Sequence, residues 1–106
     1  MSHVLDDLFA TIEARKGADP GSSYTATLFA GGTPLIARKV GEEAVETAVA
    51  ALAEKPENVT KESADLLYHL LTLWAQLGIV PEDVWTELAG RTGQSGLEEK
   101  AGRAKD

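Results

Sequence analysis

The stretch Glu62-Ser63-Ala64-Asp65-Leu66-Leu67-Tyr68-His69-Leu70-Leu71-Thr72-Leu73-Trp74 joins two carboxylates to a long apolar run. The run is apolar around most of the circumference of a helix, which predicts a helix that is largely buried. Glu62 and Asp65 are three residues apart and therefore share one face of that helix. A carboxylate beside an apolar wall needs a partner or a metal ion. This segment therefore predicts both an α-helical core and a charged site at its edge.

A second acidic motif, Glu42-Glu43-Ala44-Val45-Glu46, comes earlier in the chain. At about 100° per residue, its three glutamates lie on one face of a helix. Acidic stripes are usually solvated faces, and this is the alternative interpretation of the motif taken alone. Two such motifs on consecutive helices favour convergence of five carboxylates on one point. Their mutual repulsion would then favour a hard divalent cation such as Mg²⁺, which takes oxygen ligands.

The segments that precede the Glu42–Glu46 motif in the chain also show helical patterns. Residues 4 to 15 carry apolar side chains at helical spacing, and a loop rich in glycine, serine and proline follows. Ser22 or Ser23 is expected to cap a short helix through residue 30, which Gly31-Gly32 ends.

Thr33-Pro34 is typical of a helix start, and it predicts a long helix to about Ala53. Gly41 lies inside this helix, where it indicates either close packing against another helix or close approach of a ligand to the backbone. The apolar face is expected opposite the glutamates, formed by Val40, Ala44, Val45, Ala48, Val49 and Leu52.

Asn58 or Thr60 is expected to cap the buried helix, which should end at Gly78, and Pro81 opens a further helix. The tail from residue 97 to 106 is charged and predicts at most a weak helix. We therefore expect one all-α domain over residues 1–106, with four to five helices packed as a bundle. A core of this size is modest, so oligomerisation would help to complete it.

Composition excludes several function classes. Ten basic against 17 acidic residues give a net charge of −7, which argues against nucleic acid or an anionic membrane as a partner. The chain has no cysteine, so thiolate catalysis, disulfides and cysteine zinc sites are excluded. Asp6 and Asp7 near the start are unlike a signal peptide, and no apolar run approaches the ~20 residues of a membrane span. The expected location is the cytoplasm.

Two further side chains stand near the acidic motifs. Lys39 precedes the Glu42–Glu46 motif, where its ammonium group is placed to bind phosphate oxygens or simply to balance the acidic charge. His69 falls on the same helical face as Glu62 and Asp65, so it is either a group that supports the carboxylates or a histidine with an ordinary hydrogen bond.

With these residues in view, the chain resembles the phosphoribosyl-ATP pyrophosphohydrolases of histidine biosynthesis, within the MazG-like all-α superfamily. The superfamily pattern E-E-x-x-E followed by E-x-x-D is matched by Glu42-Glu43-x-x-Glu46 and Glu62-x-x-Asp65. Narrower features of the same resemblance are Ser23-Tyr24-Thr25-Ala26, Lys39-Val40-Gly41-Glu42-Glu43-Ala44, Ala64-Asp65-Leu66-Leu67-Tyr68-His69-Leu70-Leu71 and Arg91-x-x-x-Ser95-Gly96-x-x-Glu99-Lys100.

The resemblance implies a reaction and a set of site residues. Water would attack the α–β phosphate linkage of phosphoribosyl-ATP, giving phosphoribosyl-AMP and pyrophosphate with the help of Mg²⁺. Glu42 is implied either as an extra ligand or as the base that activates water, and Glu46 as both ligand and catalytic group. The implied metal ligands are Glu43, Glu46, Glu62 and Asp65, and the implied substrate contacts are Lys39, Arg91 and Ser95.

Two other functions remain open at this point. The first is a MazG-like hydrolase of nucleoside triphosphates with the same metal site and a different base pocket. The second is a non-catalytic helical module that binds a partner protein through the acidic stripe. In each case we expect a homodimer, because the buried helix carries more apolar surface than a small bundle covers, at Leu66, Leu67, Leu70, Leu71, Leu73, Trp74 and Leu77.

Overall fold

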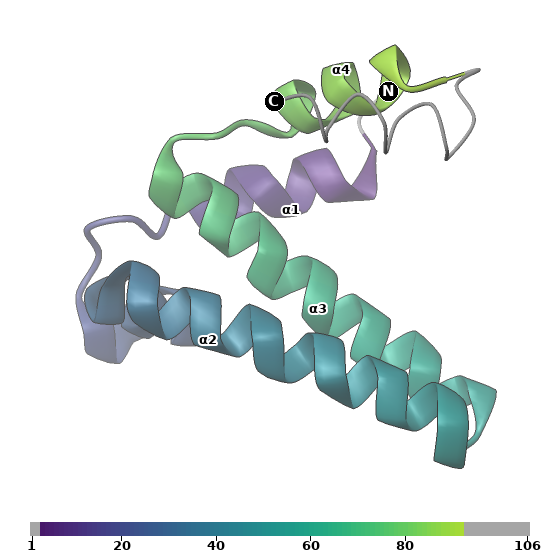
Figure 1. Ribbon diagram of the computed structural model, residues 1–106. Coiled ribbons are helices and arrows are strands. Elements are labelled where there is room, and N and C mark those ends of the chain that lie inside the picture. The colour runs from purple at the N-terminus through teal and green to yellow at the C-terminus, as the bar shows by residue number, and fades with distance from the viewer. Residues whose placement is uncertain (1–2, 93–106) are drawn as a thin grey trace.

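The computed structural model describes residues 3–92, and every regular element in this range is helical (Figure 1). The elements are α1 (Val4–Glu13), the short 3-10 helix η1 (Pro20–Ser22), α2 (Tyr24–Ala53), α3 (Pro56–Leu77) and α4 (Pro81–Gly90). The all-α prediction is confirmed, with four α-helices in the described range. None of these helices has the length and apolar character that crossing a membrane demands. The predicted tail helix lies outside the described residues.

Helices α2 and α3 form an antiparallel pair that carries the acidic motifs (Figure 1). Only Glu54 and Lys55 separate them, so the chain reverses at once and the two helices lie side by side. Helix α3 ends at Gly78, whose φ of 75° is the left-handed cap that the sequence predicted. The predicted start of α3, with Asn58 or Thr60 as its cap, was wrong. The helix begins at Pro56, and proline suits the first helical position because an N–H group there would have no partner within the helix.

A kink at Gly32 divides α2 into a first segment, residues 24–31, and a second segment, residues 33–53. Gly32 has φ 76° and ψ −175°, a conformation that side-chain-bearing residues rarely adopt. The break therefore falls where Gly31-Gly32 was expected to end a helix, although helical structure resumes at once. Ser23 caps the first segment as predicted, since its hydroxyl oxygen accepts a hydrogen bond from the Ala26 N–H at 3.0 Å.

One cluster of the apolar core lies between α1 and α3, and α2 contributes the other buried apolar residues of the described chain, Ala26, Leu28, Ile36 and Ala50. Phe9 and Ile12 of α1 pack with Leu71 and Ala75 of α3, and partly buried side chains surround them at Leu5, Leu8, Phe29, Tyr68 and Trp74. Lys16, just after α1, donates a hydrogen bond from Nζ to the Ala75 carbonyl oxygen at 2.8 Å. This bond satisfies a carbonyl near the end of α3, where a positive charge also favours the helix dipole.

The predicted apolar face of α2 was wrong for a single chain. Val45, Val49 and Leu52 are 63%, 48% and 89% exposed, although they were expected to face the core. The face that turns toward α3 instead contains Glu43, which is half-buried, and Ala50, which is fully buried. Helix α3 is the main neighbour of α2 in the described part of the chain, and it packs against the face of α2 that carries Glu43.

Gly41 does not serve close packing against another helix of the same chain. A Cβ atom added there meets nothing within 4 Å in the described residues.

We expect Gly41→Ala to stabilise the protein. Gly41 is exposed and helical, and alanine in such a position is favoured over glycine by about 0.5–1 kcal/mol. Urea denaturation of the two proteins measures this gain directly. A lower stability of the alanine variant would show that the helix around residue 41 differs from the one described.

Candidate active site

The two acidic motifs meet between α2 and α3. Glu43 of α2 and Glu62 and Asp65 of α3 each offer one carboxylate oxygen, and these three oxygens lie within 4.8 Å of one another. The convergence predicted from the helical positions is therefore confirmed for these three residues. We call them the carboxylate cluster. Asp65 is exposed, whereas Glu43 and Glu62 are half-buried, so the cluster opens to solvent on the side of Asp65.

Two oxygen atoms of the cluster have unusual surroundings. Oε2 of Glu43 and Oε2 of Glu62 are buried, and neither has a hydrogen-bond partner in the described part of the chain. Buried polar atoms are almost always satisfied, because an unpaired one is costly to remove from water. A divalent cation such as Mg²⁺ binds oxygen donors, and the three carboxylates of the cluster offer such donors close together.

Proximity alters the acidity of the cluster. The pKa of Glu43 is raised from its ordinary value of 4.5 to about 7 by burial, by contact with the Glu46 carboxyl, and by the charges of Glu46, Asp65 and Glu62. Burial also raises the pKa of Glu62, together with the neighbouring Glu46 and Asp65. Without a cation, the cluster therefore holds a proton at pH values where isolated glutamates are ionised.

We expect the stability of the metal-free protein to fall as pH rises from about 4.5 to about 7. Glu43 binds a proton more tightly in the folded chain than in the unfolded one, so its contribution is complete below 4.5 and is lost as pH rises through 7. The contribution of Glu43 to stability is measured by comparing the urea midpoints of wild type and Glu43→Gln at each pH in the presence of a chelator. A difference between the two proteins that stays constant from pH 5 to pH 8 would contradict it.

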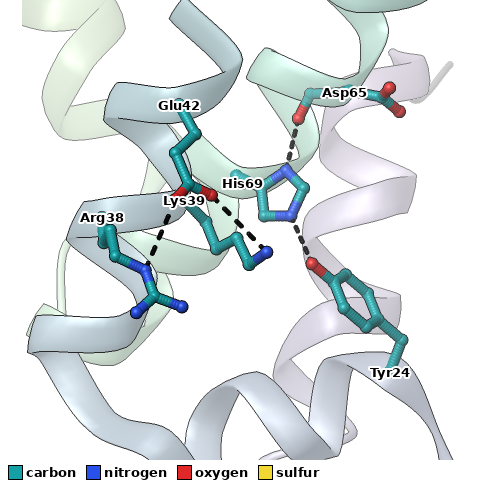
Figure 2. A network of polar contacts seen from close by, with 6 residues as sticks. All are labelled: Tyr24, Arg38, Lys39, Glu42, Asp65 and His69. Atoms are coloured by element: carbon teal, nitrogen blue, oxygen red, sulfur yellow. Dashed lines mark hydrogen bonds and ion pairs between the residues drawn. The ribbon is translucent and has the colours of Figure 1, made fainter.

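Glu46 adjoins the carboxylate cluster, whereas Glu42 is paired with basic side chains. The Glu46 carboxyl acts on the pKa of both Glu43 and Glu62, so it adjoins them while remaining exposed itself. Glu42 instead forms ion pairs with Arg38 at 3.5 Å and Lys39 at 3.6 Å (Figure 2). The structure therefore brings Glu46 to the cluster and holds Glu42 beside it.

The predicted substrate residues are brought together only in part. Lys39 lies on α2 one turn before Glu43, with its side chain partly buried. Arg91 lies at the end of α4, where it pairs with Glu87 at 3.1 Å. In Figure 1, α4, which ends before Arg91, and α2 lie at opposite sides of the molecule. Ser95 lies outside the described residues.

Tyr24 and His69 form a contact that the sequence did not single out as a pair. The Tyr24 hydroxyl bonds to His69 Nε2 at 2.8 Å, and His69 Nδ1 bonds to the Asp65 backbone oxygen at 2.7 Å (Figure 2). Beside them, the hydroxyls of Thr25 and Tyr68 form a second hydrogen bond between the same two helices. The only sequence signal for Tyr24 was its place in the Ser23-Tyr24-Thr25 stretch. The expectation of a hydrogen-bonded histidine at position 69 is confirmed.

Comparison with known proteins gives the family of the chain. The family model described as phosphoribosyl-ATP pyrophosphohydrolase matches residues 5–92. A phosphoribosyl-ATP pyrophosphatase from Paramagnetospirillum magneticum is 59% identical over 98% of this chain and 95% of its own length. Proteins of the same name from Rhodospirillum rubrum and Rhizorhabdus wittichii are 57% and 55% identical, over 96% and 99% of this chain and 87% and 99% of their own lengths. The chain therefore belongs to the phosphoribosyl-ATP pyrophosphohydrolase family.

Proposed function

We propose that this protein hydrolyses phosphoribosyl-ATP between its α and β phosphates, giving phosphoribosyl-AMP and pyrophosphate in the second step of histidine biosynthesis, with carboxylate-bound Mg²⁺. Membership of the family supports the substrate. The observation that carries the chemistry is the meeting of Glu43, Glu62 and Asp65 between α2 and α3. Phosphoryl transfer depends mainly on positioning and on neutralising oxygen charge, and a cluster of this kind supports both.

The carboxylate cluster fits Mg²⁺. Every donor is a carboxylate oxygen, the ligand type that hard cations take. The Glu43 and Glu62 carboxylates also each have one buried oxygen without a hydrogen-bond partner among the described residues. The ligands that we propose are Glu43, Glu46, Glu62 and Asp65. When bound, Mg²⁺ supplies positive charge that polarises the phosphate linkage and favours ionisation of the attacking water.

The residues around the cluster take the remaining roles. Glu46 is our first candidate for the group that accepts a proton from water, because it adjoins Glu43 and Glu62 and is exposed. Glu42 is the second candidate for this group, or an additional metal ligand. It becomes available for either role when the substrate phosphates attract Arg38 and Lys39, which pair with Glu42 in this structure. Lys39 offers its ammonium group to those phosphates.

Arg91 and Ser95 stay in the proposal as substrate contacts. Arg91 closes α4, and the family resemblance extends through both residues. Alanine substitution of each should raise KM for phosphoribosyl-ATP more than it lowers kcat, since a contact to a remote part of the substrate contributes mainly to binding.

The test of the function is turnover of phosphoribosyl-ATP against a panel of nucleoside triphosphates, followed by release of pyrophosphate. We expect phosphoribosyl-ATP to be strongly preferred, and expect EDTA to stop the reaction and Mg²⁺ to restore it. Equal turnover of the common triphosphates would instead support a general pyrophosphohydrolase. No turnover of any of them would overturn the proposal.

A second measurement separates a catalytic cluster from a solvated acidic stripe. A ligand that binds only the folded protein raises its melting temperature. We therefore expect Mg²⁺ to stabilise the wild type and to have little effect on Asp65→Asn, which keeps the size of the side chain and removes its charge. Glu57→Gln on the first turn of α3 is the matched control, because it removes one charge outside the cluster. Equal responses of all three proteins would exclude a specific cation site.

We also propose that two copies of the chain associate. Val45, Val49 and Leu52 recur at positions i, i+4 and i+7 of α2 and are exposed, and Leu67 of α3 is 42% exposed. Aliphatic side chains in such a row favour burial against a partner. A second copy can supply an identical surface, which a two-fold axis makes self-complementary.

Light scattering tests the dimer. We expect a mass of twice 11.2 kDa for the wild type and a monomer for Val49→Lys. Val4→Lys is the matched control, because Val4 is a 70% exposed valine on α1, away from this row. A wild-type protein that stays monomeric at high concentration would refute the dimer without bearing on the carboxylate cluster.

A further inference from the structure

Histidine 69 is a buried residue whose two ring nitrogens are both used. Its side chain is among the most enclosed polar groups of the described chain, at 5% exposure. Nδ1 faces the Asp65 carbonyl oxygen at 2.7 Å and Nε2 faces the Tyr24 hydroxyl at 2.8 Å (Figure 2). A carbonyl oxygen only accepts, so Nδ1 carries the proton and donates it. In the neutral ring Nε2 then accepts, and the Tyr24 hydroxyl is the donor.

The hydroxyl of Tyr24 is therefore committed to the protein. Burial raises its pKa above the ordinary value of 10.0, so the hydroxyl keeps its proton at neutral pH. The ring itself is held from behind by Tyr68, with ring centroids 6.1 Å apart and planes inclined by 23°. Yet Tyr24 is 52% exposed. Because its hydroxyl is bonded to His69 and its ring stacks on Tyr68, we infer that Tyr24 offers solvent an aromatic surface of fixed orientation.

This aromatic surface adjoins the carboxylate cluster. Two hydrogen bonds, of 2.8 Å and 2.7 Å, join the Tyr24 hydroxyl through His69 to the backbone of Asp65. The charges of Lys39, Glu43 and Asp65, which come from the second segment of α2 and from α3, also act on the pKa of the Tyr24 hydroxyl. Tyr24 itself stands on the first segment, beyond the Gly32 kink. The charged groups suit phosphates and a cation. The face of an aromatic ring carries negative potential, which disfavours phosphate and favours stacking on another flat ring.

We propose that Tyr24 stacks on the purine base of the nucleotide substrate, and that His69 is a positioning residue that fixes Tyr24 in the orientation this requires. The proposal rests on the proposed function for the identity of the substrate. It assigns the triphosphate of the substrate to Lys39 and the carboxylate cluster, and the flat purine ring to Tyr24.

Binding of two simple probes tests the stacking without relying on turnover. ADP has a purine and a diphosphate, whereas inorganic pyrophosphate has the phosphates alone. In the presence of Mg²⁺, calorimetry with Tyr24→Leu should give a Kd for ADP raised about tenfold, the usual scale for losing one base–aromatic stack, with pyrophosphate affinity unchanged. Tyr24→Phe keeps the ring and loses the bond to His69, so its loss should be smaller. Unchanged ADP affinity in Tyr24→Leu, or equal losses for both probes, would overturn the stacking role.

Matched substitutions at His69 test the positioning role. Glutamine ends in an amide near the place of Nε2 and can keep the bond to Tyr24, whereas asparagine reaches only the place of Nδ1. We expect His69→Gln to keep ADP affinity within about twofold and His69→Asn to lose as much as Tyr24→Phe. In the Tyr24→Leu background, His69→Asn should cause no further loss. Equal ADP affinities of the two histidine variants, or additive losses in the double variant, would show that His69 is structural only. Wild-type turnover of phosphoribosyl-ATP, measured separately, shows whether the proposed function itself holds.

Discussion

Asp65→Ala is expected to reduce hydrolysis of phosphoribosyl-ATP to background while leaving the metal-free protein as stable as the wild type or more stable. Asp65 is exposed and shares the carboxylate cluster with Glu43 and Glu62, so in the absence of a cation its charge only adds repulsion. With substrate, several kcal/mol of electrostatic stabilisation would depend on the Mg²⁺ ion that we propose the cluster binds, and each 1.4 kcal/mol is about tenfold in rate. A loss of a hundredfold to a thousandfold is therefore the scale expected, and Glu46→Ala should behave in the same way.

The two measurements are initial rates with Mg²⁺ and melting temperature in EDTA. Glu57→Gln, the control outside the cluster, should be close to wild type in both. His69→Ala should lose less activity than Asp65→Ala, because His69 touches the backbone of Asp65 rather than the cluster oxygens. Near-normal turnover of Asp65→Ala, or its unfolding in EDTA, would mean that the carboxylate is structural.

Gly32→Ala is expected to destabilise the protein by about 1–3 kcal/mol, because φ 76° with ψ −175° is a conformation that residues with a Cβ atom avoid. A melting temperature lower by roughly 5 °C or more corresponds to this loss. Space is not the reason, since the nearest atom to an added Cβ is Pro34 Cδ at 3.7 Å.

The same substitution elsewhere provides the controls for Gly32. Gly21→Ala should be nearly neutral, as its φ is not in the left-handed region and an added Cβ meets nothing within 4 Å. Gly41→Ala should have the opposite sign, because Gly41 is helical. A Gly32→Ala protein as stable as Gly41→Ala would show that α2 passes through residue 32 without the kink.

Local signals in the sequence predicted the helices and the carboxylate cluster. Ser23, Gly78 and Pro81 mark helix ends through chemistry that involves only their near neighbours. The spacing of Glu43, Glu62 and Asp65 predicted their meeting because a short connection makes consecutive helices antiparallel. Helix α3 started earlier than expected, since a proline at its first position was enough without a capping side chain at Lys55.

Contacts between distant parts of the chain could not be predicted in this way. Tyr24 and His69 are 45 residues apart, and their hydrogen bond depends on how the kinked first segment of α2 crosses α3. A helical wheel gives the angle between Val45 and Glu43, but it does not tell which of the two faces will meet α3. The carboxylate face does so, and this leaves the aliphatic face exposed in a single chain.

Because its carboxylates lie close together, the cluster would exchange a proton for a cation when it binds Mg²⁺ as proposed. Near neutral pH a substantial fraction of molecules carries a proton on Glu43, whose pKa is about 7, and that proton must leave when a cation is bound. Cation affinity should therefore rise with pH until Glu43 is fully ionised, and the heat of binding should depend on the buffer that takes up the proton. A pH optimum measured at one Mg²⁺ concentration then reflects the fraction of sites that hold Mg²⁺ as well as the chemical step. Raising the Mg²⁺ concentration should therefore move the acidic side of the pH–rate profile to lower pH.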